Sequence, residues 1–97
     1  MLVDGDTVYL YTGHDASTDE QVANSVYEIP EYLCYSSTDL VNWKSEGTVM
    51  TMDTVDWAKD DVSAWASQVM KYNDKYYLYY CSWDKSGKQS IGVAVAD

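Results

Sequence analysis

An Asn-Asp pair at Asn73-Asp74 separates two apolar segments that alternate with the period of a β-strand. Residues 64–71 (AWASQVMK) precede the pair, and the tyrosine-rich residues 75–82 (KYYLYYCS) follow it. Alternation over this length predicts half-buried strands, and two residues that tolerate positive φ predict a tight turn between them. The stretch therefore predicts a β-hairpin, around which the rest of the chain is arranged.

Other short strands are predicted on both sides of this hairpin, at residues 7–12, 31–37, 48–52 and 90–96. Turns are expected at Asp4-Gly5-Asp6 and Ser86-Gly87, and the polar residues 16–30 show no apolar periodicity. Residues 4–15 also resemble residues 73–84, which places Tyr9 and Tyr77 at equivalent positions. Their spacing exceeds the roughly 40 to 50 residues of one propeller blade, which fits repeated blades if one copy carries an insertion.

Composition limits the partners of the chain. Its 97 residues suffice for one small domain, with 10 Tyr, 4 Trp and no Phe. Such rings are common where one edge meets a polar ligand, although plain packing in strands is the commoner role of any one tyrosine. The net charge of −10 argues against nucleic acid and against an anionic membrane surface. MLVDGD does not resemble a signal peptide, and the compartment of the protein stays open.

Metal and redox chemistry find little support in the sequence. Cys34 and Cys81 each lie in the middle of an apolar strand, where we expect free, buried thiols, with a disulfide as the alternative. A loop starting at Asp84 opens like a calcium loop but has Val95 where an EF-hand needs its last ligand. Asp60-Asp61 is expected to be a solvated pair and not an acid–base pair. We therefore expect no metal site within this chain.

Four blocks carry a resemblance to a known family: VDGDTVYLYTGHD, LCYSSTDLVNW, WAKDDVSAWASQVMKYNDKYYLYY and IGVAVAD. In this order they resemble the first two blades of glycoside hydrolase family 43, whose members are β-xylosidases, α-L-arabinofuranosidases and arabinanases. The resemblance covers almost the whole chain. It implies an all-β fold, a fragment of about two blades of a five-bladed β-propeller. Residues 1–55 would be the outer strands of blade one, and residues 56–97 most of blade two.

The resemblance also implies an activity. Members of the family hydrolyse xylan- or arabinan-type polysaccharide with inversion, using an Asp base, a second Asp and a Glu acid. The base precedes the segment that matches Leu2, and the other two belong to later blades, so none has a matching position here. An inverting acid and base must lie roughly 6.5–9.5 Å apart across the sugar. We therefore expect a part of an inverting hydrolase, with no catalytic residue in this chain and no activity of the chain alone. The alternatives are a non-catalytic carbohydrate-binding propeller fragment and a purely structural one.

The resemblance implies that this chain supplies part of the lining of the sugar-binding site. Trp65 and Ala66 match the Trp-Ala pair that borders the subsite next to the scissile bond, although Ser67 replaces the proline that often follows. His14 and Asp15 match a His-Asp pair at a strand end, which would bind substrate or support the base. Loop capping is the alternative for His14. Trp57 is expected to be a second cavity residue or a packing residue.

Cofactors and partners follow from the same resemblance. No cofactor is expected within the chain, whereas a structural calcium ion can occupy the centre of a complete propeller. Besides carbohydrate, the expected partner is a polypeptide carrying the remaining blades, or a second copy of the chain. The reason is that both outer faces would be uncovered and the first blade would lack its innermost strand.

Overall fold

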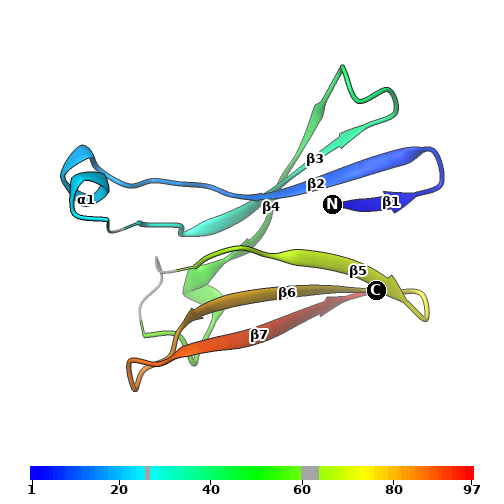
Figure 1. The fold of residues 1–97 in the computed structure, drawn as a ribbon. Coiled ribbons are helices and arrows are strands. Elements are labelled where there is room, and N and C mark those ends of the chain that lie inside the picture. Colours follow the sequence, from blue (N-terminus) through cyan, green and yellow to red (C-terminus); the bar gives the residue numbers. More distant parts are fainter. Residues whose placement is uncertain (26, 60–63) are drawn as a thin grey trace.

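The computed structural model describes residues 1–25, 27–59 and 64–97 as two antiparallel β-sheets (Figure 1). The first sheet contains β1 (Leu2–Asp4), β2 (Thr7–Gly13), β3 (Glu31–Ser37) and β4 (Lys44–Thr51). A 3-10 turn, η1 (Met52–Thr54), follows it. The second sheet contains β5 (Gln68–Tyr72), β6 (Lys75–Trp83) and β7 (Gln89–Ala96). In both sheets the spatial order of the strands equals their order in the sequence, and the predicted all-β architecture is confirmed.

The central hairpin forms where the Asn-Asp pair predicts it. Asn73 and Asp74 adopt φ values of 49° and 62°, and Tyr72 pairs with Lys75 across the turn. A second tight turn, with Gly5 at φ 60°, joins β1 to β2. Tyr9 and Tyr77 are each the third residue of the second strand in their sheet, so the similarity between the two segments reflects the same position in two similar hairpins.

Several strand boundaries differ from the expectations. The ladder of β5 begins at Gln68 and not at Ala64, which forms only an isolated bridge to Ser82. Strand β4 begins four residues before the expected residue 48, because it passes through Gly47 at φ 89° where the register against β3 shifts. Met52 lies outside β4 and begins the 3-10 turn, with 1% of its surface exposed.

Two elements were missing from the sequence prediction. The polar loop contains a short helix, α1 (Asp19–Ala23), started by a capping box in which Thr18 and Gln21 exchange hydrogen bonds of 2.7 and 3.2 Å. The second is strand β1, which pairs with β2 at the edge of the first sheet. With three residues, β1 is too short to show any alternation.

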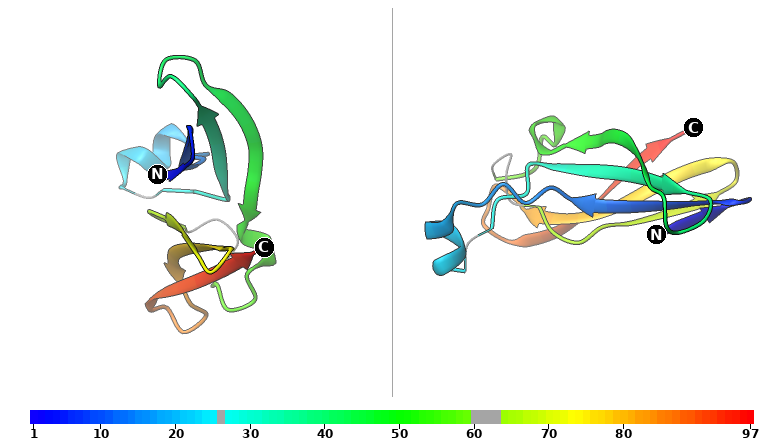
Figure 2. Two further views of the ribbon diagram at one scale, coloured as in Figure 1. Left: turned by 90° about the vertical axis from the view of Figure 1, so that its right-hand side faces the viewer. Right: turned by 90° about the horizontal axis from the view of Figure 1, so that it is seen from above.

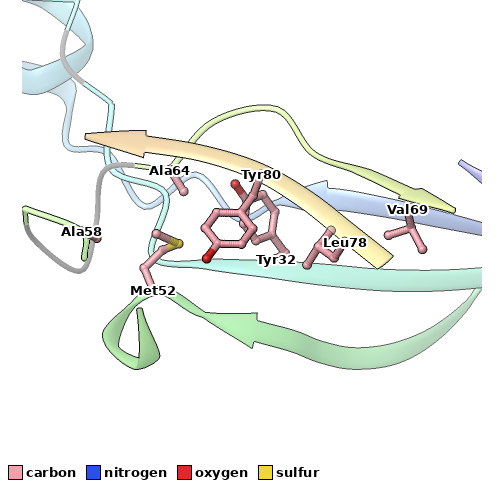
Figure 3. Close-up of a cluster of buried hydrophobic side chains, with 7 residues drawn as sticks. All are labelled: Tyr32, Met52, Ala58, Ala64, Val69, Leu78 and Tyr80. Carbon is pink, nitrogen blue, oxygen red and sulfur yellow. The ribbon is translucent and has the colours of Figure 1, made fainter. Parts of the chain in front are cut away.

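The two sheets form separate layers, as the left view of Figure 2 shows, and the core lies between them. Figure 3 shows the rings of Tyr32 and Tyr80 side by side between β3 and β6, with Met52 beneath them. The ring centroids of these two tyrosines are 6.4 Å apart. The buried cluster comprises Tyr32, Met52, Ala58, Ala64, Val69, Leu78 and Tyr80. The core is therefore shared by both sheets.

A polar contact also joins the sheets at the end of β1. The Tyr76 hydroxyl donates to Asp4 Oδ2 over 2.9 Å, and Lys71 Nζ lies 3.4 Å from the same oxygen. The hydrogen bond from Tyr76, followed by the contacts with Lys71, lowers the pKa of Asp4 below its usual value. Edge strand β1 is thus tied to the second sheet as well as to β2.

Both cysteines are free thiols, as expected, but they differ in burial. Cys34 on β3 is buried, and burial raises its pKa. Cys81 on β6 is only half-buried, so the expectation of two buried thiols is wrong for this residue. Its thiol lies on the outer face of the second sheet, opposite Ile91 of β7.

Candidate functional site

The Trp65-Ala66 segment lies just before β5, where regular pairing has not yet begun. The Trp65 N–H donates to the Cys81 carbonyl oxygen over 3.0 Å, and the Tyr32 hydroxyl donates to the Trp65 carbonyl oxygen. The Cys81 thiol lies 3.9 Å from the Ala66 carbonyl oxygen. These contacts fix the backbone of the segment, and Ala66 is exposed to solvent.

The Trp65 indole forms one wall of a shallow hollow. Its ring meets Trp83 edge to face, with centroids 5.7 Å apart and an interplanar angle of 64°. The hollow has a volume of about 350 Å³ and is lined by Trp65, Cys81, Gln89, Ser90 and Ile91. A flat apolar ring beside an amide and a hydroxyl group is suited to a ligand that has both an apolar face and hydroxyl groups. A sugar ring is such a ligand.

His14 follows the end of β2 and is held by Glu31 on β3. Its backbone N–H donates to the Glu31 carbonyl oxygen over 3.0 Å, and its Nδ1 lies 2.9 Å from Glu31 Oε1. The other carboxylate oxygen of Glu31 accepts a hydrogen bond of 3.2 Å from the Thr48 hydroxyl. About half of the His14 side chain, 51%, is exposed. Glu31 therefore fixes one ring nitrogen of His14, while the ring remains accessible from solvent.

The carboxylate of Asp15 is engaged within its own loop. Asp15 Oδ1 accepts hydrogen bonds from the Ser17 hydroxyl and, over 2.9 Å, from the Ser17 N–H. These bonds lower the pKa of Asp15, with a smaller contribution from the neighbouring His14. The geometry is that of an Asx turn. A second oxygen of the carboxylate stays available on the exposed side chain.

Trp57 lies in the packing of the second sheet. Its ring stacks on that of Tyr80 with centroids 5.9 Å apart and an interplanar angle of 14°. The Trp57 carbonyl oxygen accepts a hydrogen bond of 3.1 Å from the Lys85 N–H, and the side chain packs against the buried cluster. This position favours the packing role of Trp57 over the cavity role.

The start of β3 connects two of the expected site segments. Glu31 holds His14, and the next residue, Tyr32, holds Trp65. Successive side chains of a strand point to opposite faces, so one strand end serves both segments. Figure 1 shows the end of β2 and the segment entering β5 on the same side of the molecule. Glu31 and Tyr32 were not predicted from the sequence as site residues. The signal that could have found Glu31 is the succession of the strands at residues 7–12 and 31–37, whose antiparallel pairing places Glu31 near His14.

Metal binding finds no support in the part of the chain that the structure describes. Among residues 1–25, 27–59 and 64–97, no three His, Cys, Asp or Glu side chains are grouped as ligands. The acidic pair Asp60-Asp61 lies outside the described residues. The described residues therefore offer no set of three such ligands for a calcium ion. No helix in the described residues is long and apolar enough to cross a membrane.

Comparison with known proteins finds a matching family and two similar glycosidases. Glycosyl hydrolases family 43 matches residues 1–97. The chain is 33% identical over 96 residues to a xylosidase/arabinosidase of Humicola insolens, covering 93% of this chain and 28% of that protein. It is 30% identical over 94 residues to a xylosidase/arabinosidase of Bacteroides ovatus, again covering 93% of this chain and 28% of the relative. The chain thus spans little more than a quarter of the length of these relatives.

The fold comparison agrees. The chain superposes with a TM-score of 0.84 and 29% sequence identity on a family 43 β-xylosidase/α-arabinofuranosidase from a compost microbial metagenome, crystallised with xylotriose. The match covers 99% of this chain and 29% of that one. The two sheets are therefore a fragment of the β-propeller of this family. With the family match over every residue and the same fold in a solved member, the chain belongs to glycosyl hydrolases family 43.

Proposed function

We propose that the chain forms part of an inverting glycoside hydrolase acting on xylan- or arabinan-type polysaccharide, in which it supplies one wall of the sugar pocket. The observation that carries this proposal is the Trp65-Ala66 segment, held by backbone contacts beside a hollow that contains amide and hydroxyl groups. The relatives named as xylosidase/arabinosidase, and the xylotriose complex of a structural relative, support the choice of substrate class.

The residues of this chain would bind and orient the sugar. The Trp65 indole would stack on the apolar face of a pyranose or furanose ring and exclude water from it. The Nδ1 atom of His14 faces the Glu31 carboxylate, which favours a proton on Nδ1 and leaves Nε2 for the substrate or for a carboxylate of the pocket. Protonation of the leaving group and activation of water require two carboxyl groups roughly 6.5–9.5 Å apart. We assign neither role within this chain.

A non-catalytic carbohydrate-binding fragment is the second candidate function. It relies on the same indole and the same hollow, and it requires no acid–base pair. The two functions therefore predict the same sugar binding and different turnover. Hydrolysis separates them.

The test measures hydrolysis of an aryl β-xyloside and an aryl α-L-arabinofuranoside. The chain is assayed alone and mixed with a polypeptide that supplies the rest of a family 43 propeller. Activity only in the mixture supports the enzyme. Sugar binding that disappears in Trp65→Ala, without activity in either sample, supports the binding fragment. Activity of the purified chain alone would refute the assignment of the acid and base to other residues.

The partner proposal rests on the outer face of the second sheet. The large apolar side chains exposed on this face are Met70, Tyr72, Tyr79, Ile91, Val93 and Val95. In the described residues of β5, β6 and β7, Lys75 is the only charged residue on this face, although the chain carries a net charge of −10. The radius of gyration, 14.5 Å, also exceeds the value of about 12.5 Å typical of a closed domain of this length.

An apolar face with so little charge favours association. We propose that the part of this face formed by Met70, Tyr72, Tyr79, Val93 and Val95 packs against the remaining blades of a propeller, whereas Ile91, which lines the hollow beside Trp65, stays open to the sugar. Residues 1–55 would contribute to blade one and residues 56–97 to blade two. Self-association of the chain is the alternative. Sedimentation at micromolar concentration tests both proposals: a monomer that stays monomeric in the presence of the remaining blades would contradict them. We also propose a calcium ion at the centre of the complete propeller, with its ligands supplied from outside this chain.

A further inference from the structure

A buried hydroxyl group lies directly behind the sugar-facing segment. Tyr32 is the second residue of β3 and is 0% exposed. Its ring fills the core between the sheets, 6.4 Å from the ring of Tyr80, and its hydroxyl donates to the Trp65 carbonyl oxygen. Burial raises the pKa of Tyr32, so the hydroxyl remains a donor throughout the neutral range. A side chain of the first sheet thus bonds to the backbone of a segment 33 residues further along the chain.

The bonded segment lies outside the regular pairing of the second sheet. Between the isolated bridge at Ala64 and the first ladder residue, Gln68, the backbone is not part of a regular sheet. The Trp65 N–H is held by the Cys81 carbonyl oxygen, whereas the Trp65 carbonyl oxygen receives its hydrogen bond from Tyr32. Without that hydroxyl, a carbonyl group at the edge of the core would lose its donor. Such a loss costs more than an exposed hydrogen bond, because water does not readily replace the donor there.

We propose that Tyr32 is a positioning residue of the sugar site: its hydroxyl fixes the Trp65-Ala66 backbone and thereby sets the place of the indole against the sugar ring. This inference rests on the proposed function for its sugar-binding consequence, and on the structure alone for the hold on the backbone. Tyr32 does not touch the sugar itself. It acts only through its hydrogen bond to the Trp65 carbonyl oxygen.

The variant Tyr32→Phe removes the hydroxyl and keeps the ring that fills the core. Tyr11→Phe is the matched control, because Tyr11 is a partly buried tyrosine packed against the same core, and its hydroxyl bonds to Cys34 and not to the sugar-facing segment. Hydrogen exchange followed by NMR reports the Trp65 amide. We expect the exchange of this amide to be roughly tenfold faster in Tyr32→Phe, from the loss of one buried hydrogen bond, and unchanged in Tyr11→Phe.

Kinetics in the mixture with the remaining blades provide the second readout. A displaced platform weakens substrate and transition state alike, so Tyr32→Phe should raise KM for the aryl β-xyloside roughly tenfold at unchanged kcat. A merely structural role would instead reduce the active fraction and lower kcat at unchanged KM. Equal Trp65 exchange and equal KM in Tyr32→Phe and the unsubstituted chain would overturn the inference.

The two proposals can fail separately. If Trp65→Ala and the unsubstituted chain show the same response to xylotriose, the proposed function fails, and the exchange of the Trp65 amide alone decides whether Tyr32 holds the backbone. If Tyr32→Phe does not fold, the unsubstituted chain is used. The Tyr32 hydroxyl proton should then give a slowly exchanging NMR signal with a cross-peak to Trp65, and absence of that signal would overturn the inference.

Discussion

The close approach of strand β7 to the Trp57–Tyr80 ring stack leads to a quantitative prediction for Gly92. Gly92 lies on β7 opposite Tyr80. A Cβ atom at this position would lie 2.5 Å from Tyr80 Cζ, 2.6 Å from its hydroxyl oxygen and 2.8 Å from Trp57 Cζ2. All three distances are shorter than any normal van der Waals contact. The two rings are stacked on each other and packed against the core, so neither can move away freely.

We expect Gly92→Ala to lower the free energy of unfolding by about 3 kcal/mol, the upper end of the cost of overpacking a core. Urea unfolding of the chain, followed by tryptophan fluorescence, measures this difference. Gly87→Ala is the control. Gly87 has open space around it and φ 84°, so its substitution meets a backbone cost of roughly 1 kcal/mol and no contact with a ring.

The origin of the cost can be tested in a second background. In Tyr80→Ala the ring opposite Gly92 is absent, and Trp57 has room to shift. Alanine is favoured over glycine in a strand by about 0.5–1 kcal/mol, so Gly92→Ala should become slightly stabilising there. The same large cost in both backgrounds, or no cost in either, would refute the assignment of the effect to the ring stack.

Three further predictions concern charged groups. Hydrogen bonds from a serine hydroxyl and from backbone N–H groups of the following turn lower the pKa of Asp84 to about 2. Because the folded chain holds this pKa below the unfolded value of 3.8, ionised Asp84 stabilises the fold above pH 3.8, and this stabilisation is lost as the pH falls towards 2. Asp84→Asn should therefore make the urea midpoint less sensitive to acid between these pH values. Asp4→Asn should lower the urea midpoint and make a subsequent Lys71→Met nearly silent, since the two side chains are in contact. Glu31→Ala should weaken xylotriose binding as much as His14→Ala, with no further loss in the double variant, as titration calorimetry can show.

Local signals in the sequence predicted the hairpins well. The Asn73-Asp74 turn requires two residues that tolerate positive φ, and this chemistry is visible in the sequence itself. A comparable signal for helix α1 was present and missed. Thr18 and Gln21 have the spacing of a capping box, although the helix that follows is too short to show apolar periodicity. The bulge at Gly47 similarly left only a glycine as its trace in the sequence.

The parts that were not predicted depend on contacts between distant residues. Residues 64–67 alternate like a strand, but the Trp65 carbonyl oxygen is bonded to Tyr32 and not to a neighbouring strand. No local sequence pattern predicts this hydrogen bond between residues 33 positions apart. The same holds for Trp57, whose stacking partner, Tyr80, lies on another strand. The sequence thus indicated candidate site residues such as Trp65 and His14, whereas the residues that hold them, Tyr32 and Glu31, became visible only in the structure.

The order of the strands has a consequence for how this chain acquires its structure. Every ladder in both sheets joins strands that are consecutive in the sequence. Most closing loops are therefore short, and the entropy lost in forming each ladder is small. As the chain leaves the ribosome, the first sheet can form before the residues of the second have been synthesised. The Tyr32–Trp65 hydrogen bond and the shared core join the two sheets to each other, so we expect docking of the sheets to be the last step of folding.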